Sequence, residues 1–200
     1  MADKIKVRIK FSKHGAVKFV GHLDFMRYFQ KCIRRAKTDI AYSEGFSPHQ
    51  IMSFATALGV GVETDGDYLD IEVNSLTSCD ELKDKLNETM AEGVRVENVV
   101  ILPDGTSNAM SSVAAAGYIL YKRDGNAFDD KLINSAKEVL EADSIMIRKE
   151  NKKAKKKGRA VEGVNDYIET DIKEHIYEAS MTGDNFKCLV DASSAGNMRP

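Results

Sequence analysis

Cysteine is scarce in this chain, and long apolar runs are missing. The 200 residues contain three cysteines, Cys32, Cys79 and Cys188, at unrelated spacings and without a CxxC pair. Three scattered thiols argue against a disulfide framework, a zinc ribbon and a cysteine-ligated iron–sulfur cluster, and they indicate a reducing compartment. No run of 18 apolar residues exists, so no segment is expected to span a membrane. We therefore expect a cytoplasmic protein, and we assign it no metal and no cofactor.

The N-terminal segment also lacks the apolar core of a secretion signal. MADKIKVRIKF is charged and alternates polar with apolar residues, unlike a signal peptide. Hydrophobic residues make up 42% of the chain, which is enough to bury a core in one large domain or two small ones.

The net charge of −2 hides a segregation of charge along the chain. Residues 1–37 carry eleven Lys and Arg against two Asp and Glu, and residues 148–159 carry eight against one. The remainder therefore holds ten basic and 28 acidic residues of the totals of 29 and 31. Because charges act locally, over a screening length of about 8 Å, the two basic segments are candidates for contact with phosphate groups.

Residues 1–104 have the pattern of one α+β unit. Residues 4–11 alternate cationic with apolar side chains, the period of a half-buried strand. The further elements expected are an extended segment with turns over 37–55, helices over 22–36 and from Thr77 or Ser78 to about Ala91, and strands over 68–73 and 94–102. The order strand–helix–strand–strand–helix–strand is that of a ferredoxin-like, or split βαβ, unit.

A second series of elements follows a small, polar linker at residues 105–115. Its expected elements are a helix over 127–141, strands over 117–123, 144–149, 168–180 and 186–192, and a Lys-rich loop over 149–159. Residues 116–200 thus hold five of the six elements of a second ferredoxin-like unit. The chain ends at Met198-Arg199-Pro200, so this unit is expected to lack its last helix. The fold prediction is an α+β protein of two ferredoxin-like units in tandem.

His22 and Asp24 stand at the start of the first predicted helix, and Arg27 follows one turn later. One interpretation is an acid/base histidine beside a carboxylate, or a cluster that grips phosphate at a helix N-terminus. The alternative is structural: a capping aspartate that pairs with Arg27 at i+3. Arg34 and Arg35, later in the same helix, are further candidates for anion binding.

The segment AYSEGFSPH, residues 41–49, predicts a rigid polar loop of the kind that places side chains at sites. Its ligand-binding candidates are Tyr42, Ser43, Gly45 and Phe46, and His49 is a candidate acid/base residue. The alternative is an ordinary turn with an exposed histidine. A metal site built from His22, Asp24 and His49 is chemically admissible only if the fold brings His49 to the other two.

These segments together carry a family resemblance. FSKHGAVKFVGHLDFMRYFQKCIRRA and AYSEGFSPHQIMSFATALGVGVETDGDYLDIEV resemble the radical-SAM-linked protein family, a bacterial domain of unknown function found fused or adjacent to radical SAM proteins. Gly21 stands where the family has serine before His-Leu-Asp, and Asp67 stands where glutamate is usual. The resemblance implies a radical SAM protein as partner, but it assigns the motif residues no role. Without a cluster-ligating cysteine set, the chain cannot itself be the radical SAM catalyst.

Two basic features are candidates for RNA binding. The row Lys4, Lys6, Arg8 and Lys10 should face Asp70 and Glu72 across adjacent strands, and this pairing would partly neutralise it. The predicted sheet also lacks paired aromatic residues on which bases could stack. The Lys-rich loop offers Lys152, Lys153, Lys155, Lys156, Lys157 and Arg159. We interpret it as either a solvated loop or a phosphate clamp with steep salt dependence.

Three functional hypotheses follow. The first is an accessory module that binds RNA, or presents another substrate, for a radical SAM modification enzyme. The second is a hydrolytic or nuclease-like enzyme that uses His22, Asp24 and Arg27. The third is a protein-interaction domain that docks through its acidic surface. We favour the first, in which the chain is not an enzyme on its own.

Overall fold

The computed structural model describes residues 4–150, 155–156, 159–160, 167–193 and 198. The chain divides into two compact units, Met1–Val113 and Ala114–Pro200, each described here by itself. The described residues form a mixed α+β structure with antiparallel sheets and four α-helices, which confirms the predicted fold class at this level. None of the described helices is long and apolar enough to cross a membrane.

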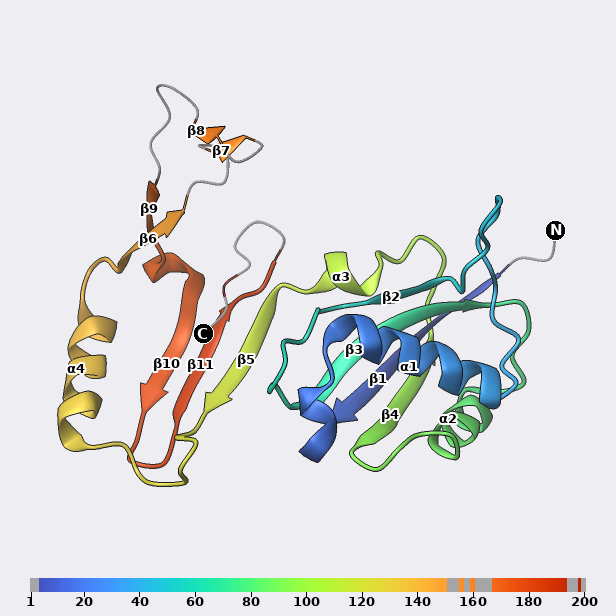
Figure 1. The fold of residues 1–200 in the computed structure, drawn as a ribbon, viewed down its shortest axis with the longest axis horizontal. Coiled ribbons are helices and arrows are strands. Elements are labelled where there is room, and N and C mark those ends of the chain that lie inside the picture. Colours follow the sequence, from blue (N-terminus) through green and yellow to red (C-terminus); the bar gives the residue numbers. More distant parts are fainter. Residues whose placement is uncertain (1–3, 151–154, 157–158, 161–166, 194–197, 199–200) are drawn as a thin grey trace. The chain divides into compact units, whose positions relative to one another are not determined.

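Unit 1 is built on a four-stranded antiparallel sheet with the order β2-β3-β1-β4 (Figure 1). The strands are β1 (Ile5–Lys13), β2 (Met52–Phe54), β3 (Thr64–Val73) and β4 (Val94–Ile101). The alternation predicted for β1 is confirmed, because Val7, Ile9 and Phe11 are fully buried. β1 also pairs with β3 in the expected register, with Arg8 opposite Asp70.

Helices α1 (His22–Arg35) and α2 (Cys79–Asn87) lie on one face of this sheet (Figure 1). The core contains Phe11, Phe25, Phe29 and Phe54, whose rings contact one another at centroid distances of 5.1–6.1 Å. Ser78 caps α2 as predicted, since its side chain accepts a hydrogen bond from the Glu81 N–H. α2 ends earlier than expected, at Asn87, and just beyond it the Thr89 N–H and hydroxyl both donate to the Leu86 carbonyl.

The other face of the sheet carries the cationic row of β1, and this row is partly neutralised, as expected. Arg8 donates to both carboxylate oxygens of Asp70, at 2.7 and 2.9 Å. Asp70 also accepts a hydrogen bond from the Ala109 N–H at 2.7 Å, at the start of α3 (Ala109–Ser112). Residues 105–113, predicted as linker, therefore belong to unit 1 and pack on its sheet.

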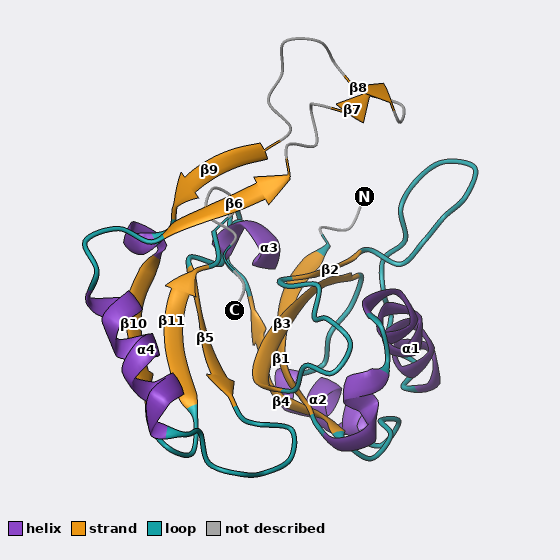
Figure 2. Ribbon diagram, turned by 60° about the vertical axis from the view of Figure 1, so that its left-hand side comes forward, coloured by secondary structure: helices purple, strands orange, loops and turns teal. Residues whose placement is uncertain are grey.

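Unit 2 has a three-stranded sheet with the order β10-β11-β5, and helix α4 contacts β10 (Figure 2). Its elements are β5 (Ala115–Leu120), α4 (Asp130–Glu141), β10 (Ile176–Met181) and β11 (Phe186–Asp191). β6 (Met146–Glu150) and β9 (Tyr167–Asp171) form a separate two-stranded ladder, as do β7 (Lys155–Lys156) and β8 (Arg159–Ala160).

The prediction of one strand over 168–180 is wrong, because a turn and a short 3-10 helix separate β9 from β10. The Asp171 carboxylate accepts hydrogen bonds from the N–H groups of Ile145 and Lys173, each at 2.9 Å. This turn starts the short 3-10 helix Lys173–His175. In addition, β11 occupies the centre of the sheet, where a split βαβ unit would place its first strand.

Candidate functional site

His22 is the first residue of α1, and its predicted partner Asp24 is engaged elsewhere. Asp24 accepts a hydrogen bond from Arg27 at 3.2 Å, which confirms the predicted i+3 pair. Asp24 is not the helix cap, because that position is Gly21 and no side chain caps the helix there. The imidazole of His22 packs edge-on against Phe54, with ring centroids 5.4 Å apart. In the described part of the chain no hydrogen bond joins Asp24 to His22.

The predicted rigid loop is a hairpin over residues 42–50, here called the 42–50 hairpin. Tyr42 bridges to Gln50, and the Ser43 N–H donates to the His49 carbonyl at 2.8 Å. The Ser43 hydroxyl lies 2.8 Å from His49 Nδ1 and accepts a hydrogen bond from the His49 N–H at 3.1 Å. Phe46 stands at the tip, and its side chain is completely exposed, with a relative accessibility of 111%.

The structure does not bring His49 to His22. α1 has 14 residues and is therefore about 21 Å long. His22 lies at its first turn, whereas the 42–50 hairpin follows its C-terminal end (Figure 1). The side chain of Gln50 donates to the carbonyl of Gln30 at 3.4 Å, which holds the base of the hairpin against the second half of α1. The two histidines thus belong to different sites.

The cations of α1 fall into two groups. Arg27, Lys31 and Arg34 are exposed and lie at spacings of four and three residues, so they follow one face of the helix. We call these three residues the α1 stripe. Arg35 instead donates to the Thr89 carbonyl at 2.9 Å and to Cys32 Sγ at 3.0 Å. Arg35 thus joins α1 to the segment after α2, and these hydrogen bonds favour a role in holding the fold over the predicted role in anion binding.

Two ionisable side chains that sequence reasoning missed are buried near His22. Lys13 is 0% exposed at the end of β1, and Asp67 is 6% exposed near the start of β3. Phe11 pairs with Asp67 across the two strands, and Lys13 pairs with Thr64 beyond a register shift. Lys13 and Asp67 both line a small space, the Lys13 pocket, formed by Phe11, Lys13, His22, Phe25, Phe54, Thr56, Leu58 and Asp67.

The signal for these residues was present in the sequence. Lys13 continues the odd-numbered row of β1 whose apolar members face the core, and period-two alternation points it inward. Asp67 likewise stands in the inward row of β3 that continues with Leu69 and Ile71. Sequence reasoning ended the first strand at Phe11 and started the third at Tyr68, so it excluded both residues.

The Lys13 pocket is closed in this structure. Its side chains leave no room for a water molecule. Lys13 Nζ donates to the Val20 carbonyl at 3.0 Å and lies 4.8 Å from the centre of the Phe25 ring. Among the described residues no carboxylate forms an ion pair with it. A buried ammonium group with so few partners is costly to keep charged.

Burial shifts the pKa values of both buried groups toward their neutral forms. Loss of hydration lowers the pKa of Lys13 from its ordinary 10.5 and raises the pKa of Asp67 from its ordinary 3.8. Hydrogen bonds to Asp67 oppose this rise: one comes from the Thr56 hydroxyl at 2.6 Å and one from the Tyr68 N–H at 2.8 Å. The charge of His22 likewise lowers the pKa of Asp67.

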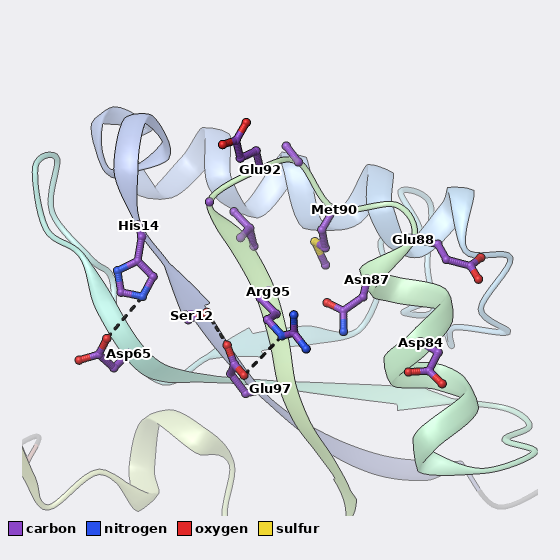
Figure 3. A pocket seen from close by; sticks show the side chains of 13 residues that line it. Ser12, His14, Asp65, Asp84, Asn87, Glu88, Met90, Glu92, Arg95 and Glu97 are labelled. Carbon is purple, nitrogen blue, oxygen red and sulfur yellow. Dashed lines mark hydrogen bonds and ion pairs between the residues drawn. The ribbon is translucent and has the colours of Figure 1, made fainter.

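A larger hollow of about 920 Å³ lies on another side of unit 1 (Figure 3). Its lining carries five carboxylates, Asp65, Asp84, Glu88, Glu92 and Glu97, against two basic side chains, His14 and Arg95. In Figure 3, both basic groups point to carboxylates: His14 lies 3.4 Å from Asp65, and Arg95 lies 3.7 Å from Glu97. This excess of negative charge makes the hollow unsuitable for phosphate.

Two further predicted features are the metal site and the Lys-rich loop. Within the described residues, no three His, Cys, Asp or Glu side chains are grouped to hold a metal ion. The side chains of the Lys-rich candidates, Lys152, Lys153, Lys155, Lys156, Lys157 and Arg159, lie outside the described residues.

Comparison with known proteins identifies a family for this chain. A family model described as an uncharacterized protein conserved in bacteria (DUF2344) matches residues 6–200. No curated protein matches the sequence.

Proposed function

The chain belongs to this bacterial family of uncharacterised proteins, and we propose that it is a cytoplasmic accessory module that binds single-stranded RNA. The surface proposed for binding consists of the 42–50 hairpin and the α1 stripe. In the same proposal, the bound RNA is presented to a radical SAM modification enzyme.

The observation that carries the proposal is the exposure of Phe46. Its ring lies entirely in solvent, at the tip of a hairpin held together by the bonds between Ser43 and His49. Unpaired bases of single-stranded RNA stack on such rings, at about 1–3 kcal/mol per base. Because the hairpin is already ordered, binding does not have to order it. Tyr42, 47% exposed at the base of the hairpin, offers a second ring.

The α1 stripe supplies positive charge on the helix that the base of the hairpin contacts through Gln50 and Gln30. Lys31 and Arg34 are exposed on the half of α1 that leads into the hairpin, and Arg27 shares its charge with Asp24. For single strands, each phosphate neutralised contributes a slope of about −0.7 to the dependence of log K on log salt. Two to three such contacts predict a slope of about −1.4 to −2.1.

Other surfaces of unit 1 support RNA binding less well. Two cations of the outward row of β1 are engaged, since Arg8 pairs with Asp70 and Lys6 reaches the Thr106 carbonyl at 3.4 Å. The large hollow is lined mainly by carboxylates. Both features favour α1 and the 42–50 hairpin as the RNA-binding surface.

The radical SAM partner is proposed from the sequence resemblance alone. That partner would have to supply the iron–sulfur cluster, since this chain has only three scattered cysteines. We also propose a ferredoxin-like fold for unit 1, because its element order and its strand order β2-β3-β1-β4 agree with a split βαβ unit. The sheet order of unit 2 is different, so we do not extend this fold to it.

Fluorescence anisotropy with a labelled single-stranded oligoribonucleotide, measured over a range of salt concentrations, tests the proposal. Phe46→Ala should weaken binding by about 5- to 150-fold, the loss of one stacked base. Phe19→Ala is the matched control, because Phe19 is 65% exposed but lies outside the proposed surface; it should leave affinity unchanged. Absence of binding by the wild-type protein at low salt would overturn the proposal.

A protein-docking role is the second candidate, because exposed aromatic residues also anchor protein interfaces. In that case the wild-type protein would not bind RNA, yet it would co-purify with the radical SAM partner, and Phe46→Ala would abolish the co-purification. The hydrolytic hypothesis has less support, since Asp24 pairs with Arg27 rather than with His22.

A further inference from the structure

Lys13 has no role in the proposed RNA surface, yet its surroundings are those of a reactive amine. Its side chain is completely buried beside three phenylalanine rings, those of Phe11, Phe25 and Phe54. The Val20 carbonyl accepts one of its hydrogen bonds. A purely structural lysine at this depth would be expected to have a carboxylate partner, and the described residues provide none within ion-pair distance.

We propose that Lys13 is a nucleophilic amine that condenses with the carbonyl group of a small aldehyde or ketone, and that Asp67 carries the protons of this reaction. The Lys13 pocket would be a binding site for carbonyl compounds, separate from the surface formed by α1 and the 42–50 hairpin.

The geometry brings both groups to one pocket. Lys13 from β1 and Asp67 from β3 line the same small space, and Asp67 pairs with Phe11, two residues before Lys13 on β1. Thr56 and the Tyr68 N–H hold both oxygens of Asp67, which fixes the orientation of the carboxyl group. His22 is the other titratable group that lines the pocket.

The protonation states support the same assignment. A lysine is nucleophilic only as the neutral amine, and desolvation in an apolar pocket raises the neutral fraction. Burial lowers the pKa of Lys13 and raises the pKa of Asp67. Both shifts favour a neutral amine beside a protonated carboxyl group.

The condensation balances with these two residues. The Lys13 lone pair attacks the carbonyl carbon, a C–N bond forms, and the electrons of the C=O double bond move to oxygen. Asp67 gives its proton to that oxygen and takes one from the nitrogen. Asp67 then protonates the hydroxyl group, which leaves as water while the nitrogen lone pair forms the C=N bond. The products are water and a protonated imine paired with the Asp67 carboxylate.

Access to the amine requires a local movement, because the pocket has no room for water as it stands. Leu58 lines the pocket from the segment between β2 and β3. Among the residues that line the pocket, Leu58 is the apolar one that lies in a loop rather than in a helix or strand. Displacement of Leu58 would open the pocket without breaking the sheet.

The test is reductive trapping on the full-length wild-type protein near neutral pH. The probes are acetaldehyde and, separately, glyoxylate, each with sodium cyanoborohydride, and modification is mapped by peptide mass spectrometry. Lys13 should be modified faster than the exposed Lys31, by about tenfold for each unit by which its pKa is lowered. A rate at Lys13 equal to or below that at Lys31 overturns the proposal, since an inert buried lysine would be protected.

Two variants separate the roles of the residues. Asp67→Asn keeps the size of the side chain but cannot exchange the proton, so trapping at Lys13 should slow while trapping at Lys31 stays the same. An unchanged rate at Lys13 would remove Asp67 from the mechanism. Lys13→Arg should abolish the modified peptide and confirm its identity.

Discussion

Lys13 and Phe46 depart from the usual distribution of residues in opposite directions. Lys13 carries an amine and is 0% exposed, whereas Phe46 is apolar and fully exposed. Lysine is almost never fully buried without a partner, and a large aromatic side chain gains free energy when it leaves water. Both positions therefore lower stability relative to an ordinary side chain at the same place.

The difference between the two residues lies in what holds each in position. Lys13 is fixed by the core, because the end of β1 and the helix α1 enclose it with Phe11 and Phe25. Phe46 is fixed by hydrogen bonds, because Ser43 and His49 close the hairpin below it. Local order that keeps an unfavourable side chain in place is typical of functional sites. The two proposed sites thus differ in kind: the core encloses one, and the other is open to solvent.

The largest expected effect comes from replacing the buried amine. Lys13→Met keeps an unbranched chain but has no amine to desolvate or to deprotonate on folding. The free energy of unfolding should rise by about 1–4 kcal/mol, the gain typical when buried charges are replaced by apolar side chains. Urea denaturation checks this.

The matched control for this substitution is Lys31→Met, since Lys31 is exposed on α1. It should change the free energy of unfolding by no more than about 0.5 kcal/mol. If Lys13→Met destabilised the protein instead, Lys13 would be a structural residue, and the contrast with Phe46 would be lost.

A second, smaller effect is the pH dependence of the difference in free energy of unfolding between Lys13→Met and the wild-type protein. The pKa of Lys13 is lowered by burial, so between its folded value and the ordinary 10.5 the unfolded chain holds a proton that the folded chain has lost. Stability then rises with pH across this window. The advantage of Lys13→Met over wild type should therefore shrink as pH rises toward 10.5, by up to about 1.4 kcal/mol per pH unit.

Denaturation of both proteins at a series of alkaline pH values tests this trend. The other titratable groups facing Lys13, Asp67 and His22, are present in both proteins. Their titration cancels in the difference to the extent that they do not interact with Lys13. A difference that stays constant with pH would show that Lys13 has an ordinary pKa in the folded protein.

Sequence patterns predicted the elements of unit 1 well because these elements follow from local periodicity. The alternation of β1, the apolar stripe of α1 and the Ser78 cap each need only near neighbours in the chain. The interruption between β9 and β10 was missed. One of the two hydrogen bonds that Asp171 accepts there is local, from the Lys173 N–H, but the other comes from Ile145, which is 26 residues away.

The candidate sites show the same limit. The sequence identified Phe46 and His22, but it could not show that the hairpin of His49 contacts the second half of α1 while His22 begins the helix. Nor did it place Asp67 in the pocket lined by His22, since Asp67 reaches the pocket only through the pairing of β1 with β3. Side chains brought together by sheet register lie beyond what spacing along one segment can predict.

The smallest expected effect concerns the order of the 42–50 hairpin. Ser43→Ala removes the hydroxyl that accepts from the His49 N–H and contacts its ring. One hydrogen bond of this kind contributes about 0.5–1.5 kcal/mol. Because the bond orders an exposed hairpin rather than the core, the loss should appear in RNA affinity, as a decrease of about two- to tenfold. The urea midpoint should stay nearly the same.

Ser43→Thr keeps the hydroxyl and should restore the affinity, which separates loss of the bond from any other effect of the alanine. Fluorescence anisotropy of the three proteins at one salt concentration makes the measurement. If Ser43→Ala bound RNA as tightly as wild type, RNA affinity would depend on the exposed ring of Phe46 and not on the hydrogen bonds between Ser43 and His49. The open site would then depend on the aromatic ring alone, whereas the closed site would still depend on the packing that encloses Lys13.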